Sequence, residues 1–162
     1  MKKFIKLTAL LLVLALSLFA AGCSSYDRLE KAFLENGFAL VTEIEGDGNL
    51  LKDDLTRGIR EVEAYEFKKT AGFLGAESVL AVVYEFKSVK ELTQAVKQSE
   101  VLSLFIDELE QDEELDDIYE ELVEDGYANG KCLVVPITLS NSAKQQVTSI
   151  VRSAYLISPD LF

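Results

Sequence analysis

Residues 78–87 read SVLAVVYEFK, and positions 79–84 of this stretch are all apolar or aromatic. Apolar residues fall on both alternating sets of positions, so neither face of a strand here would be polar. Such a run predicts a central strand covered on both faces, or one that is flanked by strands with helices on one side. We take this strand as the centre of the fold.

A second strand is predicted just before it. Residues 61–68 read EVEAYEFK, and the tetrapeptide Tyr-Glu-Phe-Lys occurs at Tyr65–Lys68 and again at Tyr84–Lys87. The segment between the two strands contains Gly72 and Gly75. Two similar strands joined by a glycine-containing loop predict an antiparallel pair.

Helices and further strands surround this pair. Helices are predicted at 26–36 with Asp27 as its cap, from Ser88, at 112–125, and from Ser142 to about Leu156; Ser88 and Ser142 each begin a capping-box pattern. Strands are predicted at 38–44 and 131–135, the latter in a hairpin around Asn129-Gly130. We therefore expect a single α+β domain over residues 26–162, with a mostly antiparallel sheet of four or five strands packed by helices. The predicted core comprises Phe33, Phe38, Val79, Val83, Tyr84, Phe86, Leu92, Phe105, Ile118, Leu122, Val134 and Ile150.

Two helix-to-strand junctions resemble each other at an offset of 89 residues. Phe33–Ala39 reads FLENGFA, and Leu122–Ala128 reads LVEDGYA. Both contain a helix end, a glycine and an aromatic residue that starts a strand. Two interpretations remain open: a duplicated helix–strands–helix unit, or the common form of any helix-to-strand junction.

The N-terminus has the three-part layout of a secretory signal. Lys2, Lys3 and Lys6 precede an uncharged, largely apolar stretch, Leu7–Ala20, which is followed by small residues. That stretch has 14 residues, whereas a helix that spans a bilayer needs about 20. The layout therefore predicts an export signal over residues 1–22.

The residues at its end, Ala20-Ala21-Gly22-Cys23, resemble the lipobox of bacterial lipoproteins, although Ala20 stands where that family usually has Leu. The resemblance covers Met1–Cys23. It implies cleavage before Cys23, attachment of diacylglycerol to the Cys23 thiol, and residence at the extracytoplasmic face of the bacterial cell membrane. An ordinary signal peptide cut at the same small residues, or an uncleaved anchor, remains an alternative. Residues 23–25 would form a short tether.

The charge of the chain restricts its partners. Removal of residues 1–22 leaves 13 basic and 28 acidic residues. This balance excludes the basic footprint of a nucleic-acid-binding protein, and it requires lipid rather than a polybasic patch for membrane attachment. Residues 98–130 contain 13 acidic residues and no Lys or Arg. The segment is interpreted either as a solvated helix face or as a surface for a basic protein partner or a cation.

Residues typical of catalysis are scarce. The chain has no His, which excludes imidazole-dependent triads and histidine metal ligands. Residues 43–54 resemble a calcium loop, but Glu43 and Asp54 depart from its preferred Asp and Glu ends, so we predict no metal site and no cofactor. Cys132 lies in an apolar run and is interpreted as a small core residue. We expect a non-enzymatic binding or interaction module; the alternative is a small surface-anchored hydrolase that uses paired carboxylates.

Overall fold

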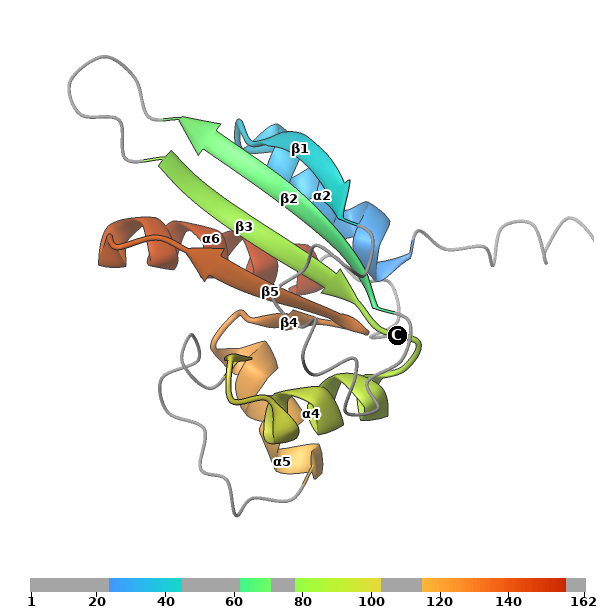
Figure 1. The fold of residues 1–162 in the computed structure, drawn as a ribbon. Coiled ribbons are helices and arrows are strands. Elements are labelled where there is room, and N and C mark those ends of the chain that lie inside the picture. The colour runs from blue at the N-terminus through green and yellow to red at the C-terminus, as the bar shows by residue number, and fades with distance from the viewer. Residues whose placement is uncertain (1–23, 45–61, 71–77, 103–114, 157–162) are drawn as a thin grey trace, which may run out of the picture.

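The structure, a computed structural model, describes residues 24–44, 62–70, 78–102 and 115–156 (Figure 1). In these residues five strands form one sheet in the order β1-β2-β3-β5-β4, and every neighbouring pair is antiparallel. The strands are β1 (Ala39–Ile44), β2 (Glu63–Thr70), β3 (Ser78–Glu85), β4 (Ala128–Asn129) and β5 (Cys132–Ile137). The helices are α2 (Ser25–Glu35), α4 (Val89–Gln98), α5 (Leu115–Glu124) and α6 (Asn141–Leu156). The predicted α+β fold with an antiparallel sheet is confirmed.

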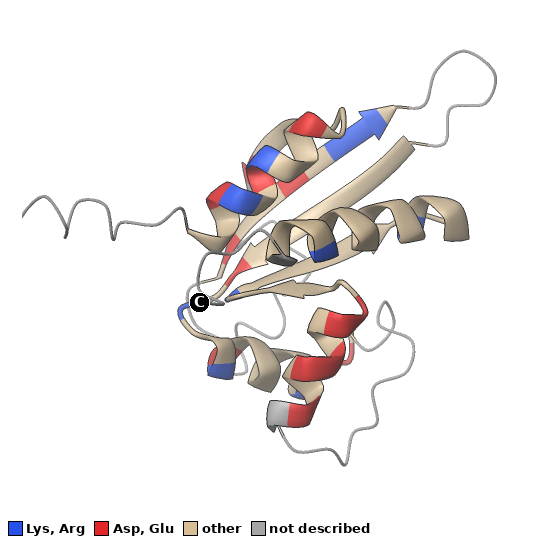
Figure 2. Cartoon of the chain, turned by 180° about the vertical axis from the view of Figure 1, so that it is seen from behind, with Lys and Arg blue, Asp and Glu red and all other residues tan. Residues whose placement is uncertain are grey.

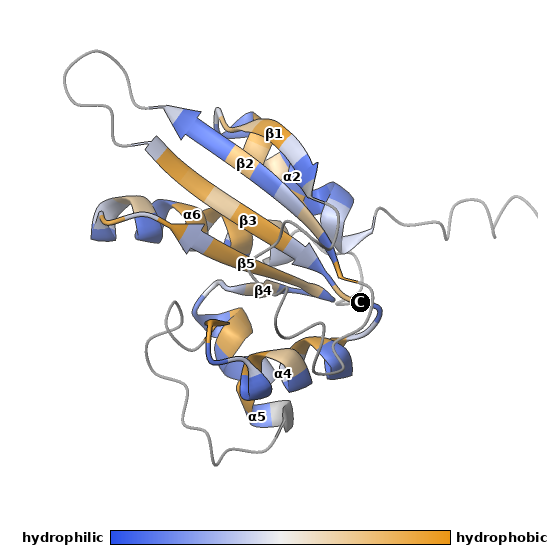
Figure 3. Ribbon diagram, in the orientation of Figure 1, coloured by the Kyte–Doolittle hydropathy of each residue, from blue (hydrophilic) through white to orange (hydrophobic). Residues whose placement is uncertain are grey.

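Strand β3 is the central strand, and helices cover both of its faces, as the first of the two interpretations of residues 78–87 predicts. Val79, Ala81 and Val83 pack in a core with α2 and α6. The alternate residues Val82 and Tyr84 pack in a second core with α4 and α5. Figure 3 shows the result as a largely apolar β3 and β5 beside a more polar β2.

The predicted core is confirmed wherever the structure describes it. Eleven of the twelve predicted residues are 0–4% exposed, and Phe105 lies outside the described residues. The predicted pairing of β2 with β3 is also confirmed, with Tyr65 opposite Val83 and Phe67 opposite Ala81. Burial on both faces of one sheet therefore accounts for most of the apolar pattern in the chain.

The two similar junctions have the same backbone geometry. Gly37 and Gly126 have φ angles of 80° and 79°. In each junction the residue after the glycine donates its N–H to a carbonyl five residues earlier, at 3.0 and 2.7 Å. This is a Schellman motif, in which the glycine takes the left-handed conformation that other residues disfavour. The helix ends predicted at both glycines are confirmed.

The arrangement around β3 relates the two halves of the chain. The first half contains α2, β1, β2 and α4, and the second half contains α5, β4, β5 and α6. Strands β1 and β4 lie at opposite edges of the sheet, and α2 and α5 lie on opposite faces. A two-fold rotation about β3 would relate the halves in this way. A duplicated helix–strands–helix unit predicts this arrangement, with β3 as an additional central strand.

Two predicted helix caps are wrong by a few residues. Ser24, not Asp27, caps α2, and Ser25 is already helical, so the predicted tether over residues 23–25 extends too far into the domain. Ser140, not Ser142, caps α6, since its Oγ accepts the N–H of Ala143 at 3.4 Å. In both cases two or more residues that favour the N-cap position lie within three positions of each other, so the local pattern does not decide between them.

The predicted hairpin between β4 and β5 is confirmed, but its loop lies one residue further along. Asn129 pairs with Cys132, so the two loop residues are Gly130 and Lys131. Gly130 has a φ of 56°, which suits the first position of a tight hairpin loop. The tip of this hairpin lies beside the start of α2.

Candidate functional site

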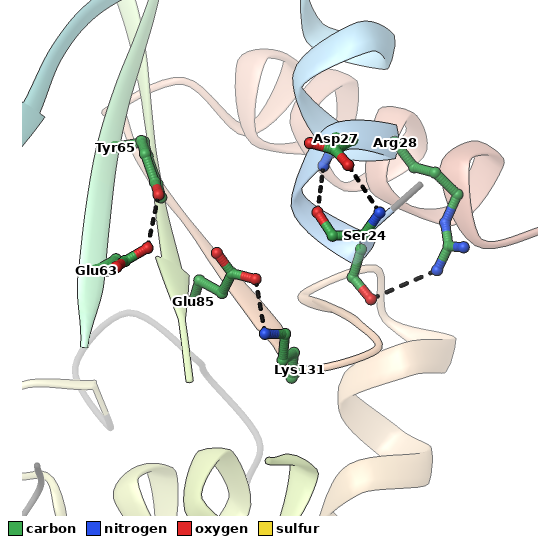
Figure 4. Close-up of polar contacts among 8 residues, drawn as sticks. Ser24, Asp27, Arg28, Glu63, Tyr65, Glu85 and Lys131 are labelled. Atoms are coloured by element: carbon green, nitrogen blue, oxygen red, sulfur yellow. Dashed lines mark hydrogen bonds and ion pairs between the residues drawn. The ribbon is translucent and has the colours of Figure 1, made fainter. Parts of the chain in front are cut away.

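The first turn of α2 is closed by a capping box directly after the predicted lipidation residue, Cys23. The backbone N–H of Ser24 donates to Oδ2 of Asp27 at 2.8 Å, and the N–H of Asp27 donates to Oγ of Ser24 at 3.1 Å (Figure 4). These reciprocal bonds fix Ser24 as part of the folded domain. Consecutive Cα atoms lie about 3.8 Å apart, so Cys23 is joined to a fixed residue. Cys23 and the lipobox residues 20–22 lie outside the described residues.

The tip of the β4–β5 hairpin packs against this helix start. A Cβ atom added to Gly130 would collide with Oγ of Ser25. The Ser25 hydroxyl accepts a bond from Nη2 of Arg28 at 3.4 Å, and Tyr119 on α5 donates its hydroxyl to the Gly130 carbonyl at 3.0 Å. Contacts to α2 and α5 therefore hold the hairpin tip from two sides.

A charged pair lies next to this contact. Glu63 on β2 and Glu85 on β3 are directly opposite in the sheet, where two like charges repel. Lys131 compensates them: its Nζ lies 2.9 Å from Oε1 of Glu85, as Figure 4 shows. The Lys131 side chain is 40% exposed and the Glu85 side chain is 14% exposed. The hydrogen bond to Glu85 raises the pKa of Lys131, which stays protonated.

Two tyrosines cover the α2 side of these carboxylates. The ring of Tyr26 on α2 stacks on that of Tyr65 on β2, with centroids 3.9 Å apart. The Tyr65 hydroxyl donates to Oε2 of Glu63 at 2.9 Å. Burial raises the pKa of both hydroxyls; negative charge from Glu30 and Glu43 adds to the rise at Tyr26, and the bond to Glu63 adds to it at Tyr65. Both therefore remain neutral hydrogen-bond donors.

The carboxylates that the sheet brings together do not have the arrangement that the hydrolase hypothesis needs. Glu63 is exposed, and Glu85 is bound to Lys131. A catalytic carboxylate pair requires two convergent groups with different environments in one cleft. Among the described residues, no group of three or more Asp, Glu, Cys or His side chains is placed to hold a metal. Of the calcium-like segment 43–54, only Glu43 and Ile44 are described, and both belong to β1.

Cys132 is a core residue, as the sequence predicts. Its side chain is 0% exposed and its thiol is free. Burial, with a contribution from Glu85, raises the pKa of the thiol to about 12. Because the thiolate is the reactive species, this cysteine is chemically inert in the folded protein.

The described part of the acidic segment centres on α5. Asp117, Glu120, Glu124 and Asp125 are exposed, whereas Ile118 and Leu122 are buried. Figure 2 shows the acidic residues gathered on this helix. Helix α5 packs on the face of the sheet opposite α2, and its Tyr119 reaches the hairpin tip beside the start of α2. The acidic residues between positions 103 and 114 lie outside the described residues.

Several contacts around the start of α2 and the β4–β5 hairpin tip were not predicted. The Ser24–Asp27 capping box follows the pattern Ser-x-x-Asp, which the sequence shows, but the predicted cap was Asp27. The Glu85–Lys131 pair and the Ser25–Gly130 contact join residues far apart in the chain, and only the sheet order brings them together. We call the surface formed by residues 24–28, 85–90 and 129–131 the N-cap end of the domain.

Comparison of the chain with protein-family models, with curated proteins and with solved structures found no match. Within the described residues, no helix is both long and apolar enough to span a membrane.

Proposed function

We propose that this protein is a lipid-anchored bacterial cell-envelope protein whose mature chain begins at Cys23. The observation that carries the proposal is the position of Ser24. The capping box holds Ser24 in the folded domain, and the lipobox-like sequence predicts cleavage directly before Cys23, the residue that precedes Ser24.

In this proposal the acyl chains on Cys23 hold the domain at the extracytoplasmic face of the cell membrane. A single acyl chain gives only marginal binding, whereas two or more hold a protein firmly. The acidic composition of the domain supports the same conclusion, since 28 acidic residues would not be attracted to anionic lipid without a covalent anchor.

The test is a comparison of the wild-type protein with the Cys23→Ala variant, expressed in bacteria. We expect the wild type in the membrane fraction at the mass of the cleaved chain, and the variant at the mass of the precursor. The matched control is Cys132→Ala, which changes the other cysteine and leaves both fractionation and processing unchanged. Identical fractionation and processing of wild type and Cys23→Ala would contradict the proposal.

For the domain itself we propose a binding role rather than catalysis. The support is the exposed acidic side of α5, which carries Asp117, Glu120 and Glu124 and is followed by exposed Asp125; the helix contains no basic residue. A partner with a basic surface matches this charge. Crosslinking in intact membranes followed by purification should recover a basic protein with the wild type, and recovery should fall for a variant with all four residues changed to Asn or Gln. Equal recovery with both proteins would exclude α5 as the binding surface.

A further inference from the structure

The N-cap end of the domain differs in charge from the rest of the molecule. Arg28 lies one turn after Ser24, and Lys131 follows Gly130 at the hairpin tip. Two of the acids there are already engaged: Asp27 binds the Ser24 N–H, and Glu85 binds Lys131. This end is therefore far less acidic than the chain as a whole.

The junction between β3 and α4 extends the same surface. Phe86 donates its N–H to the Lys131 carbonyl at 3.0 Å, so the next residues, Lys87 to Lys90, start beside the hairpin tip. Lys87 and Lys90 are exposed, and Val89 between them is 36% exposed. An apolar side chain flanked by lysines suits the boundary between lipid headgroups and acyl chains.

The covalent geometry determines which surface faces a membrane. Cys23 is bonded to Ser24, which the capping box fixes, so lipid on Cys23 would have no flexible spacer. The residues nearest the bilayer are then those that touch the first turn of α2, namely the hairpin tip and, through it, the β3–α4 junction. Figure 2 shows basic residues at the start of α4 and acidic residues along α5; anionic headgroups attract the first group and repel the second.

We infer that the N-cap end is a second membrane-binding surface, in which Lys87 and Lys90 bind the phosphates of anionic lipid headgroups beside the anchor. This inference rests on the proposed lipid anchor at Cys23. It goes further in giving the domain one fixed orientation on the membrane: the N-cap end faces lipid, and the far ends of the strands, near Leu139, face away from it. Strand β5 separates these ends by about 17 Å.

The test uses the mature, membrane-extracted protein in vesicles of phosphatidylethanolamine and phosphatidylglycerol that contain a headgroup nitroxide lipid. A fluorophore is attached to Val89→Cys, Leu139→Cys or Glu124→Cys; the lipid blocks Cys23, and burial protects Cys132. We expect several-fold stronger quenching at position 89 than at positions 139 and 124. Equal quenching at all three positions, or the strongest quenching at 124, would overturn the inference.

A charge-reversed pair tests the lysines. Lys87→Glu with Lys90→Glu should reduce quenching at position 89, whereas Lys68→Glu with Lys97→Glu makes the same change in net charge away from the N-cap end and should leave it unchanged. An equal effect of both pairs would contradict binding at Lys87 and Lys90. Vesicle flotation separates the two proposals: a protein that does not float contradicts the anchor and with it this inference, whereas a floating protein without position-dependent quenching contradicts this inference alone.

Discussion

Gly130 lies so close to Ser25 that any side chain at position 130 would collide with the Ser25 hydroxyl. This contact joins the tip of the β4–β5 hairpin to the first turn of α2, although the two segments are far apart in the sequence. It also means that the residue after the N-cap is held by tertiary packing. The rigid start of the domain, on which the proposed orientation depends, therefore rests on this contact and on the capping box.

The Gly130→Ala substitution should destabilise the domain for two reasons. Position 130 has a φ of 56°, where a residue with a Cβ loses about 1–2 kcal/mol, and the new methyl group displaces the Ser25 hydroxyl from its bond with Arg28. The matched control is Gly37→Ala, which has the same strain at φ 80° but meets only Cε of Lys69, at 3.7 Å. Thermal unfolding should show a larger loss for Gly130→Ala; equal losses would mean that the Ser25 contact contributes nothing.

Gly126→Ala should be more damaging than either of these substitutions. Its Cβ would collide with the backbone carbonyl of Thr148 in α6, which cannot rotate away as a serine hydroxyl can. Strain and overpacking together predict a loss of about 3 kcal/mol. Chemical denaturation of the three glycine variants measures the order, and a Gly126 variant as stable as Gly37→Ala would show that α6 is not packed on this junction as described.

Removal of the N-cap should cost stability without changing the core. Ser24→Ala leaves the Asp27 N–H without its cap, and replacing a serine at this position costs about 1 kcal/mol. Ser88→Ala at the start of α4, where the hydroxyl accepts the Glu91 N–H at 3.2 Å, is a matched control for the loss of one cap bond. The Ser24 backbone N–H, which donates to Oδ2 of Asp27, is retained in Ser24→Ala, so each substitution removes one side-chain cap bond and denaturant titration should show losses of similar size. No loss for Ser24→Ala would contradict a domain that starts at this residue.

The protein should lose stability as the pH rises above 9. The thiol pKa of Cys132 rises from 9.0 to about 12 on folding, and the pKa values of Tyr26 and Tyr65 are also raised. Above pH 9 the unfolded chain releases protons that the folded chain retains, so unfolding becomes more favourable with each step in pH. The stabilisation is complete below pH 9 and is lost between pH 9 and about 12.

The variant that checks this effect is Cys132→Ala, whose thermal midpoint should fall less steeply between pH 8 and pH 11 than that of the wild type. The comparison of slopes separates the proton effect from the smaller core volume, which lowers the midpoint equally at every pH. Parallel curves for the two proteins would show that the Cys132 thiol does not contribute.

Much of the fold follows from local patterns. The continuous apolar run at 78–87 predicts a central strand, because only a strand covered on both faces buries residues of both alternating sets. Gly37 and Gly126 predict helix ends because the left-handed conformation there suits glycine. These features depend on a few neighbouring residues, and the structure confirms them.

The features that were missed depend on distant parts of the chain. Strand β5 lies between β3 and β4 in the sheet. This sheet order cannot be deduced from the sequence of any one strand. The sheet order places Lys131 beside Glu85 and Gly130 beside Ser25, so the N-cap end could not be predicted without it. The cap at Ser140 was missed because Ser142, two residues later, matches the capping-box pattern.

In the proposed mature protein, Cys23 is the first residue and carries the lipid. Mass spectrometry of the intact protein purified from bacterial membranes measures both properties at once. We expect a chain of residues 23–162 with a diacylglyceryl group, and any further acyl group, on the N-terminal cysteine. An unmodified Cys23, either within an uncleaved chain or at the start of a chain recovered from the soluble fraction, would contradict the proposal.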